Sequence, residues 1–418
     1  MKRIILHCDC NNFFASVETV FNPAYRGVPM AVCGSEENRH GIVLAKNEIA
    51  KRYGIKTAET VYSARKKCPD LVIAKPHHRL YSEYSRKVNE IYSRYTDRIE
   101  PFGIDESWLD ISGSRILNGD GVAIANRIRE EVKQELGITV SVGVSFNKVF
   151  AKLGSDYKKP DAVTLIDESN YKDIVFPLPA SDLLFVGKKT AKMLETLGIK
   201  TIGALANASE EILNIRLGKM GTMLHKYANG LDDDPVARIG EREDVKSVGS
   251  GHTFRRNITG IDEWREGLSY LSEDVARRLR KQGMKCMTVQ VTVKDEFLIT
   301  IQRQRRINPA TDISSEISDT ALLILKDAWR PDAPIRALTV TALNLVKTEH
   351  LAEQIDMFSL DNDKLREKKK EKELAVDKIR QKFGSSAIKS GLALSDNLHM
   401  YGGEEEIPDF LLDQILKE

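Results

Sequence analysis

The sequence has few cysteines, no long hydrophobic run and almost no net charge. Its five cysteines are odd in number and include no Cys-x-x-Cys pair, so a zinc site would lack a second pair of ligands. Scattered reduced thiols fit a cytoplasmic protein. The first apolar run stops at Asp9 and none approaches about 18 residues, so we expect neither a signal peptide nor a membrane-spanning helix. The net charge of +2 is too small to indicate nucleic-acid binding by itself. Only local clusters of basic residues can indicate such binding here.

The length of 418 residues, with 41% hydrophobic and 30% charged residues, fits a globular protein of about three domains. Apolar spacing over the first 165 or so residues predicts alternating strands and helices. Strands are expected at 3–8, 30–33, 98–104, 107–111 and 138–145, and helices at 14–20, 48–53, 81–95, 122–137 and 148–157. The clean alternation in 138–145 predicts a strand with one buried face.

Strand signals fade after residue 166. Residues 166–235 contain paired short helices joined by glycine turns, and an acidic stretch that ends in proline indicates a boundary before a linker at 236–244. Residues 245–347 return to α/β, with two amphipathic helices and with strands expected at 286–293, 297–306 and 338–346. Residues 348–418 form a tail with a helix whose charges we expect to be solvated.

Acidic residues stand at the ends of several expected strands. Asp9 ends the first strand, and Asp105-Glu106 lie between two further extended segments. Each pattern has an ordinary explanation, since adjacent acids often form a solvated turn and Asp9 is also a suitable helix N-cap. If the strands share a sheet, however, the carboxylates converge and repel one another unless cations neutralise them. Oxygen ligands suit Mg²⁺, two ions about 3.5–4 Å apart support in-line phosphoryl displacement, and the backbone carbonyl of Cys10 is a further candidate ligand.

Four segments carry a more specific signal: DCNNFFASVE (9–18), IDESWLDIS (104–112), VSVGVSFNKVFAKLGSDYKKP (140–160) and the glycine-turn helices of 166–235. In this order and spacing, residues 1–346 resemble the Y-family DNA polymerases, the DNA polymerase IV and UmuC-like enzymes that copy damaged templates. The resemblance implies an α+β multidomain fold. Its parts would be a palm with a mixed or antiparallel sheet (1–10 and 76–165), small fingers (11–75), an all-helical thumb with helix-hairpin-helix elements (166–235) and an α/β little finger (245–347).

The resemblance also implies roles for individual residues. Asp9, Asp105 and Glu106 match the metal-binding carboxylates of the palm, with Glu106 as the active-site glutamate. Phe14 matches the steric gate, an aromatic side chain that clashes with a ribose 2′-hydroxyl. The backbone of Phe13 and Phe14 is implied to turn over the triphosphate, whereas the Phe13 ring is expected to fill the core.

Basic groups should meet the triphosphate. Lys159 matches the family's triphosphate lysine, and a solvated lysine pair at a helix end is the alternative. The finger helix departs from the family's Tyr-x-x-Arg pattern, because Glu48 replaces the tyrosine and Lys51 replaces the arginine. A lysine lacks the bidentate fork, so the phosphate geometry must differ. Arg52 competes with Lys51 for this contact, and Asn47 is a further candidate.

Three regions are candidate DNA contacts. A helix-hairpin-helix would offer backbone N–H groups at Gly187 and Lys188, although Phe185 stands where the family has its first glycine. Residues 216–221 are a second candidate hairpin, with a plain helical turn as the alternative. The basic runs of the third region match the little finger, which lies along the duplex backbone; a solvated face is the alternative. Their candidate residues are Arg277, Arg278, Arg303 and Arg305.

A short peptide in the tail resembles the bacterial sliding-clamp (beta clamp) motif, in which apolar anchors follow a glutamine. Its candidate residues are Gln354, Ile355, Met357 and Phe358. The family resemblance implies a low-fidelity, template-directed DNA polymerase for translesion synthesis, and we expect a monomer that uses two Mg²⁺ ions, dNTPs and primer-template DNA. A nucleotide cyclase with a related two-metal core and a catalytically inactive DNA scaffold are the alternatives.

Overall fold

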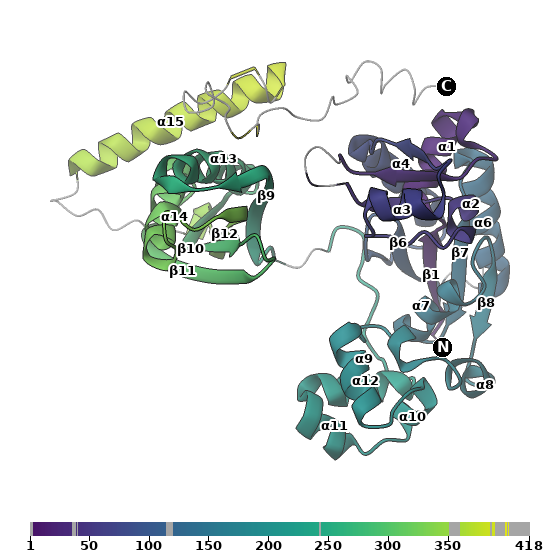
Figure 1. The fold of residues 1–418 in the computed structure, drawn as a ribbon. Helices are drawn as coiled ribbons and strands as arrows, with labels where there is room; N and C mark the ends of the chain where they lie inside the picture. The colour runs from purple at the N-terminus through teal and green to yellow at the C-terminus, as the bar shows by residue number, and fades with distance from the viewer. Residues whose placement is uncertain are drawn as a thin grey trace. The chain divides into compact units, whose positions relative to one another are not determined.

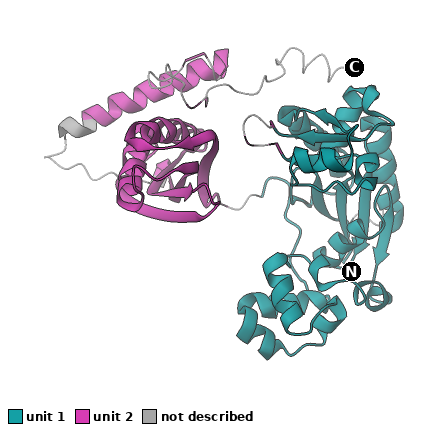
Figure 2. Cartoon of the chain, viewed as in Figure 1, with its two compact units in different colours: residues 1–34, 42–242, 407–418 teal, residues 35–41, 243–406 magenta. Residues whose placement is uncertain are grey.

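The computed structural model describes residues 3–35, 39, 41–113, 120–241, 244–350, 360–384, 387–388, 398 and 400. They form two compact units, whose described parts fall within 1–34 and 42–242 for unit 1 and within 35–41 and 243–406 for unit 2 (Figure 2). No helix among these residues is long and apolar enough to cross a bilayer. The candidate clamp peptide at 354–358 lies outside the described residues.

Unit 1 is built on a five-stranded sheet in the order β5-β6-β1-β7-β8. The central strand β1 is antiparallel to β6 and to β7, while β8 pairs parallel with β7 (Figure 1). The bounds are β1 Ile5–Cys10, β5 Ile99–Pro101, β6 Glu106–Asp110, β7 Val140–Ser145 and β8 Val163–Ile166. Strand β1 therefore runs two residues past the expected end at 8, so Asp9 lies inside a strand rather than after it.

The two faces of this sheet are covered by different helices. Leu6, Cys8 and Cys10 of β1 enter a core shared with three helices, because alternate residues of a strand share one face. These helices are α1 (Phe13–Phe21), α4 (His78–Ser93) and α6 (Gly121–Leu136). The intervening residues of β1, which include His7 and Asp9, face α7 (Lys148–Tyr157) and the residues just after it.

Strand β7 is buried along its whole length, so the expectation of one buried face was wrong. The reason is that α7 packs directly against it at Gly143. A Cβ atom there would lie 1.8 Å from the carbonyl oxygen of Ala151, so only glycine allows this approach. The close contact brings α7 onto the face of the sheet that carries Asp9.

A smaller sheet in the order β3-β2-β4 and a set of short helices complete unit 1. The sequence predicted β2 and α2 but missed β3, β4 and α3. All four residues of β2 are apolar and buried, whereas most residues of β3 and β4 are only half-buried. The bounds are β2 Met30–Cys33, β3 Val43–Lys46, β4 Val72–Ala74, α2 Glu48–Arg52, α3 Val61–Lys67, α8 Tyr171–Val175, α9 Lys188–Thr196, α10 Ile202–Ala206, α11 Glu210–Leu217 and α12 Lys219–Ala228. The helices from α8 onward share their core with Val149, Phe150 and Leu153 of α7.

Unit 2 has an antiparallel sheet in the order β11-β10-β12-β9, with two helices packed on the sheet (Figure 1). The sequence missed β9, whose glycines, serine and arginines give no strand period. The bounds are β9 Ser247–Ile258, α13 Gly260–Lys281, β10 Met284–Lys294, β11 Thr300–Thr311, α14 Ser314–Ala328 and β12 Ile335–Lys347.

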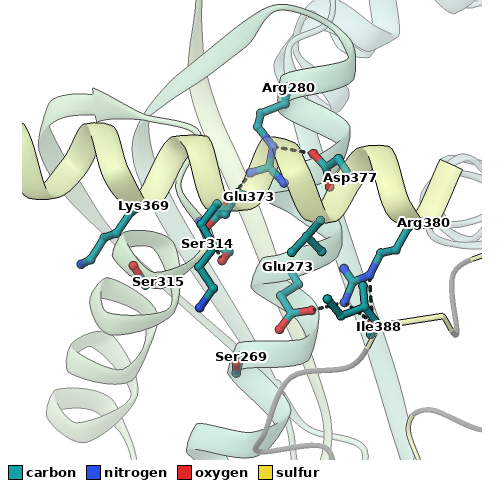
Figure 3. Close-up of a pocket in the computed structure, with 12 residues that line it drawn as sticks. Ser269, Glu273, Arg280, Ser314, Ser315, Lys369, Glu373, Asp377, Arg380 and Ile388 are labelled. Atoms are coloured by element: carbon teal, nitrogen blue, oxygen red, sulfur yellow. Dashed lines mark hydrogen bonds and ion pairs between the residues drawn. The ribbon is translucent and has the colours of Figure 1, made fainter. Parts of the chain in front are cut away.

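The charged tail helix α15 (Leu360–Phe383) is docked on the helices of unit 2 (Figure 3). Arg280 of α13, only 8% exposed, is paired with Glu373 and lies 2.7 Å from Asp377. Arg366 holds both carboxylate oxygens of Glu316 on α14, at 2.6 and 3.0 Å. The prediction that the charges of this helix are solvated is therefore wrong for the side that forms ion pairs with α13 and α14.

Part of the expected linker at 236–244 is also packed rather than free. Val236 is fully buried, and the N–H of Ala237 donates to Glu100 of β5. The N–H of Ile239 donates to the carbonyl of Asp97. These contacts hold the first part of that stretch along the edge of the five-stranded sheet.

Candidate active site

The three candidate acids meet at one end of β1. Asp9 and Glu106 are direct partners across the β1–β6 pair, and residues so paired project on the same face of a sheet. The N–H of Cys10 donates to the carbonyl of Asp105 at 3.0 Å, which places the third acid beside the other two. The N-cap interpretation of Asp9 was wrong, since the cap position of α1 is Asn12 and Asp9 pairs elsewhere.

Asp9 is paired with a lysine just after α7. Its Oδ2 lies 2.7 Å from Nζ of Lys159, which also lies 2.8 Å from Asp156. Burial raises the pKa of Asp9, and the ammonium of Lys159 opposes this shift. Burial alone would lower the pKa of Lys159, but the two carboxylates raise it above its usual value. The lysine therefore stays charged beside the acids.

Glu106 is held by two basic groups that the sequence interpretation missed. Its Oε2 is bonded to Nζ of Lys152 and lies 3.1 Å from Nε2 of the buried His7, whose Nδ1 is 2.8 Å from Oγ of Ser155. Burial would raise the pKa of Glu106, but His7 and Lys152 lower it to about 2. Burial lowers the pKa of His7.

Two simple patterns would have found these neighbours. His7 precedes Asp9 by two residues, the spacing of one strand face, and Lys152 shares a helical stripe of α7 with Asp156.

Among the residues that the structure describes, no lysine forms an ion pair with Asp105. Burial raises its pKa to about 6, and the charges of Asp9 and Glu106 add to the rise, while Lys159 opposes it. Burial and the charges of its two carboxylate neighbours thus both disfavour the ionised form of Asp105. A divalent cation would relieve such repulsion.

The carboxylates of Asp9, Asp105 and Glu106 suit a hard cation, although lysines now pair with Asp9 and Glu106. The carboxylates offer only oxygen, which Mg²⁺ prefers. Among the described residues, no three His, Cys, Asp or Glu side chains are gathered closely enough to hold a metal as they stand. The thiols of Cys8 and Cys10 lie on the opposite, core face, where burial raises their pKa values. Zinc ligation by these cysteines is therefore not supported.

The turn after β1 is fixed by two asparagines. Asn11 is buried, donates to Oγ1 of Thr139 at 3.1 Å and accepts from Oγ of Ser141 at 2.9 Å. Asn12 has φ 51°, a left-handed conformation that asparagine tolerates better than most residues. The chain thereby reverses into α1. The Phe13 ring is buried in the core, as expected, while Phe14 is half-buried.

Lys51 points toward an acid rather than standing free. Its side chain is 54% exposed, and Nζ lies 3.5 Å from Oε1 of Glu48. The same oxygen accepts from Nδ2 of Asn12 at 3.0 Å, so α2 is tied to the turn that leads into α1, the helix of Phe14. Arg52 is exposed at the end of α2.

The candidate Asn47 has a structural role. Its Oδ1 accepts from the N–H groups of Ala50 and Met30, at 2.9 and 3.2 Å. Its Nδ2 donates to the carbonyl of Val28 at 2.8 Å. The amide of Asn47 thus caps α2 and joins it to the start of β2, and one N–H of Nδ2 remains for the candidate phosphate contact.

In the first expected DNA hairpin, Phe185 stands at the position of the family's first glycine and adopts a backbone conformation that suits glycine. Phe185 has φ 67°, a left-handed conformation that glycine adopts most readily, and Gly187 stands at the N-cap of α9. Lys188 begins that helix and is exposed. In the second hairpin, Gly218 joins α11 to α12 with φ 62°. A plain helical turn is therefore wrong for residues 216–221.

The four candidate arginines of unit 2 do not form one cluster. Arg277 and Arg278 lie on α13 and pair with Asp274, and Arg278 also donates to the carbonyl of Gly249 at 2.7 Å. Arg303 and Arg305 lie on the exposed strand β11, at the edge of the sheet, and Arg305 lies 2.6 Å from Asp327.

Comparisons with known proteins give one consistent result. The sequence pattern of the impB/mucB/samB family matches residues 8–156, and that of its C-terminal domain matches residues 245–357. The chain is 48% identical over 396 residues to a DNA polymerase IV of Acetivibrio thermocellus, covering 95% of this chain and 98% of the relative. It is 38% identical to a DNA polymerase IV of Clostridium kluyveri (94% and 98% covered) and 34% identical to one of Bacillus anthracis (94% and 94% covered).

The fold has a solved counterpart. A Y-family DNA polymerase chimera superposes with a TM-score of 0.73 at 24% identity, covering 82% of this chain and 99% of the chimera. The expected α+β fold with several sheets and many helices is thus confirmed. From the two family matches and the identity to its relatives, the chain belongs to the impB/mucB/samB family of Y-family DNA polymerases.

Proposed function

We propose that the protein is a template-directed DNA polymerase for translesion synthesis, which adds dNTPs to a primer 3′ end past damaged template bases. The observation that carries this proposal is the pairing of Asp9 with Glu106, with Asp105 beside them, in a chain whose relatives are named DNA polymerase IV. We infer the low fidelity of this polymerase from the family resemblance alone.

Enzymes of this family depend on metal, and two Mg²⁺ ions are part of the proposal. Asp9, Asp105, Glu106 and the backbone carbonyl of Cys10 would hold them. When bound, the metal would activate the primer 3′-hydroxyl and neutralise charge on the reacting phosphates. The raised pKa of Asp105 supports this, since the carboxylates repel one another without a cation.

The chain's own groups would then bind and orient the nucleotide. Lys159 would exchange Asp9 for a phosphate oxygen once a cation holds that carboxylate. Lys51 would release Glu48 in the same way, with the exposed Arg52 as its competitor. Phe14 is proposed as the steric gate against ribonucleotides, with its backbone and that of Phe13 over the triphosphate.

Beyond the reacting primer end, the primer-template duplex would be held by other parts of the chain. Backbone N–H groups at Gly187 and Lys188 are the proposed thumb contacts. In the little finger, Arg303 is the best placed because β11 is exposed, and Arg305 would have to release Asp327. We also propose cytoplasmic location, a monomeric state and binding of a sliding clamp. Deleting 354–358 should abolish clamp pull-down and leave unassisted extension unchanged.

The proposal is tested with purified protein, a primed template, one dNTP and Mg²⁺. Glu106→Gln and Asp105→Ala should each lower extension by about 100- to 1,000-fold, the range seen when a main stabilising group is removed. The control is Asp97→Asn, a change at a carboxylate that is 75% exposed. Release of a cyclic nucleotide without extension would favour a cyclase instead. DNA binding by a wild-type protein that extends no primer would favour the inactive scaffold.

A further inference from the structure

The ring of Phe14 lies against a tyrosine from the neighbouring helix. The ring centroids of Phe14 and Tyr81 are 4.1 Å apart and the planes differ by 13°, which is a parallel stack. Tyr81 is fully buried, whereas Phe14 keeps part of its surface exposed. Helices α1 and α4 pack together, so the stack lies at their interface (Figure 1).

His78 borders the same ring from another direction. It meets Phe14 edge-on, with centroids 6.0 Å apart and planes at 84°. It also meets Tyr81 edge-on, at 5.9 Å and 84°. A stacked neighbour and an edge-on neighbour together leave the Phe14 ring little freedom to change rotamer.

A buried carboxylate anchors the hydroxyl of Tyr81. This hydroxyl donates to Oε1 of Glu18, and Nδ1 of His77 donates to the same oxygen at 2.8 Å. Glu18 is 4% exposed and lies one helical turn after Phe14 on α1. A carboxylate removed from water is stable only with such partners, so the pairing ties Tyr81 to the helix that carries Phe14.

We infer that Tyr81 and Glu18 are positioning residues that set the sugar selectivity of the polymerase by holding the Phe14 ring in place. The inference rests on the proposed function, in which Phe14 is the steric gate. A gate excludes one extra hydroxyl only while its ring cannot yield, because a change of rotamer would open room for a single oxygen atom. Tyr81 blocks that movement, and Glu18 prevents Tyr81 from moving away.

The measurement is the ratio of kcat/KM for a dNTP to kcat/KM for the matching rNTP, in single-nucleotide primer extension by the full-length chain. Phe14→Ala should lower this ratio most. Tyr81→Leu, which removes the stacked ring, should lower it about tenfold or more. Tyr81→Phe and Glu18→Gln keep the shape but remove or weaken the hydrogen bond, and each should lower it about threefold.

Tyr84→Leu is the matched control. Tyr84 lies in the same helix and the same core, but its ring meets Phe21, at 5.7 Å and 75°, rather than Phe14. This variant loses a similar apolar area, so its melting temperature should fall while the selectivity ratio stays the same. In the Phe14→Ala background, Tyr81→Leu should lower the ratio no further, because Tyr81 acts through Phe14.

The possible results separate this inference from the proposed gate. If Phe14→Ala lowers the ratio and Tyr81→Leu does not, the inference is wrong and the gate stands. If Tyr81→Leu does not fold, an unchanged ratio in both Tyr81→Phe and Glu18→Gln leads to the same conclusion. An equal loss in Tyr84→Leu would also overturn the inference. An unchanged ratio in Phe14→Ala would overturn the gate itself.

Discussion

At the scale of single residues, the ionised carboxylate of Asp105 lowers the free energy of unfolding. It is half-buried beside Asp9 and Glu106, whereas those two acids have Lys159 and Lys152 as partners. Its pKa of about 6 means that folding disfavours its ionised form at neutral pH. Sites that bind a ligand often carry such unfavourable charge when the ligand is absent.

Asp105→Asn should therefore stabilise the metal-free protein. In the folded protein the pKa of Asp105 is about 6, above the ordinary 3.8. The loss of unfolding free energy caused by its ionised carboxylate is therefore fully present above pH 6 and disappears as pH falls toward 4. We expect a gain on the order of 2 kcal/mol in unfolding free energy at pH 7.5, and none near pH 4. Urea unfolding with a chelator, compared with Asp97→Asn, measures it. A variant less stable than wild type at pH 7.5 would contradict this account of Asp105.

At the scale of elements, the site depends on how closely α7 approaches β7. The helix supplies Lys152 and leads into Lys159, and its contact with the strand requires glycine at 143. The β1 side chains that carry the site chemistry lie on the face that α7 covers. Packing of this one helix thus sets the positions of both lysines relative to the acids.

Gly143→Ala should disturb that packing severely. The added Cβ would meet the carbonyl oxygen of Ala151 at 1.8 Å and the amide nitrogen of Ser155 at 2.5 Å, so the backbone must move. We expect a loss of about 3 kcal/mol or more in unfolding free energy, with reduced extension activity. Gly113→Ala is the control, because nothing lies within 4 Å of a Cβ there. Equal stability of the two variants would show that α7 can shift without cost.

A second element, α15, is held mainly by charge. Arg280→Met should leave Glu373 and Asp377 without their main partner in a largely buried place. We expect α15 to lose roughly 2 kcal/mol of docking free energy, or about 30-fold in amide protection by hydrogen exchange. Arg330→Met, at an 83% exposed position, should change nothing. Undiminished protection of α15 in Arg280→Met would refute docking through these pairs.

At the scale of the whole molecule, the net charge of +2 conceals an uneven distribution. Acids gather in the active site, while unit 2 carries exposed arginines on β11. DNA affinity should therefore depend on local clusters and fall steeply as salt rises.

The salt dependence of DNA binding tests which arginines contribute. Arg303→Gln should weaken binding alike for all sequences and reduce the slope of log K against log salt by about one. Arg86→Gln is the control, since Glu83 and Glu90 already neutralise that charge on α4. Binding by fluorescence anisotropy between low and moderate salt measures both. An unchanged slope in Arg303→Gln would exclude β11 from the DNA contact.

The sequence by itself predicted the larger elements and the composition of the site. Helix α7 and strand β2 occur at the expected residues, because long periodic runs and capping residues act locally. The short strands β3 and β4 were missed, since most of their residues are only half-buried and they lack the continuous buried apolar run of β2. The motifs also indicated Asp9, Asp105 and Glu106 as one group, because their spacing resembles a known family.

Only the tertiary structure decided what each of these acids faces. Lys152, His7 and Lys159 reach them through strand pairing and through the packing of α7, which join residues that lie far apart in the sequence. The support of Phe14 by Tyr81 and Glu18 likewise exists only where α1 meets α4. Local sequence sets which side chains are present and which face they occupy. Their charge states and partners depend on burial and distance, which long-range packing alone determines.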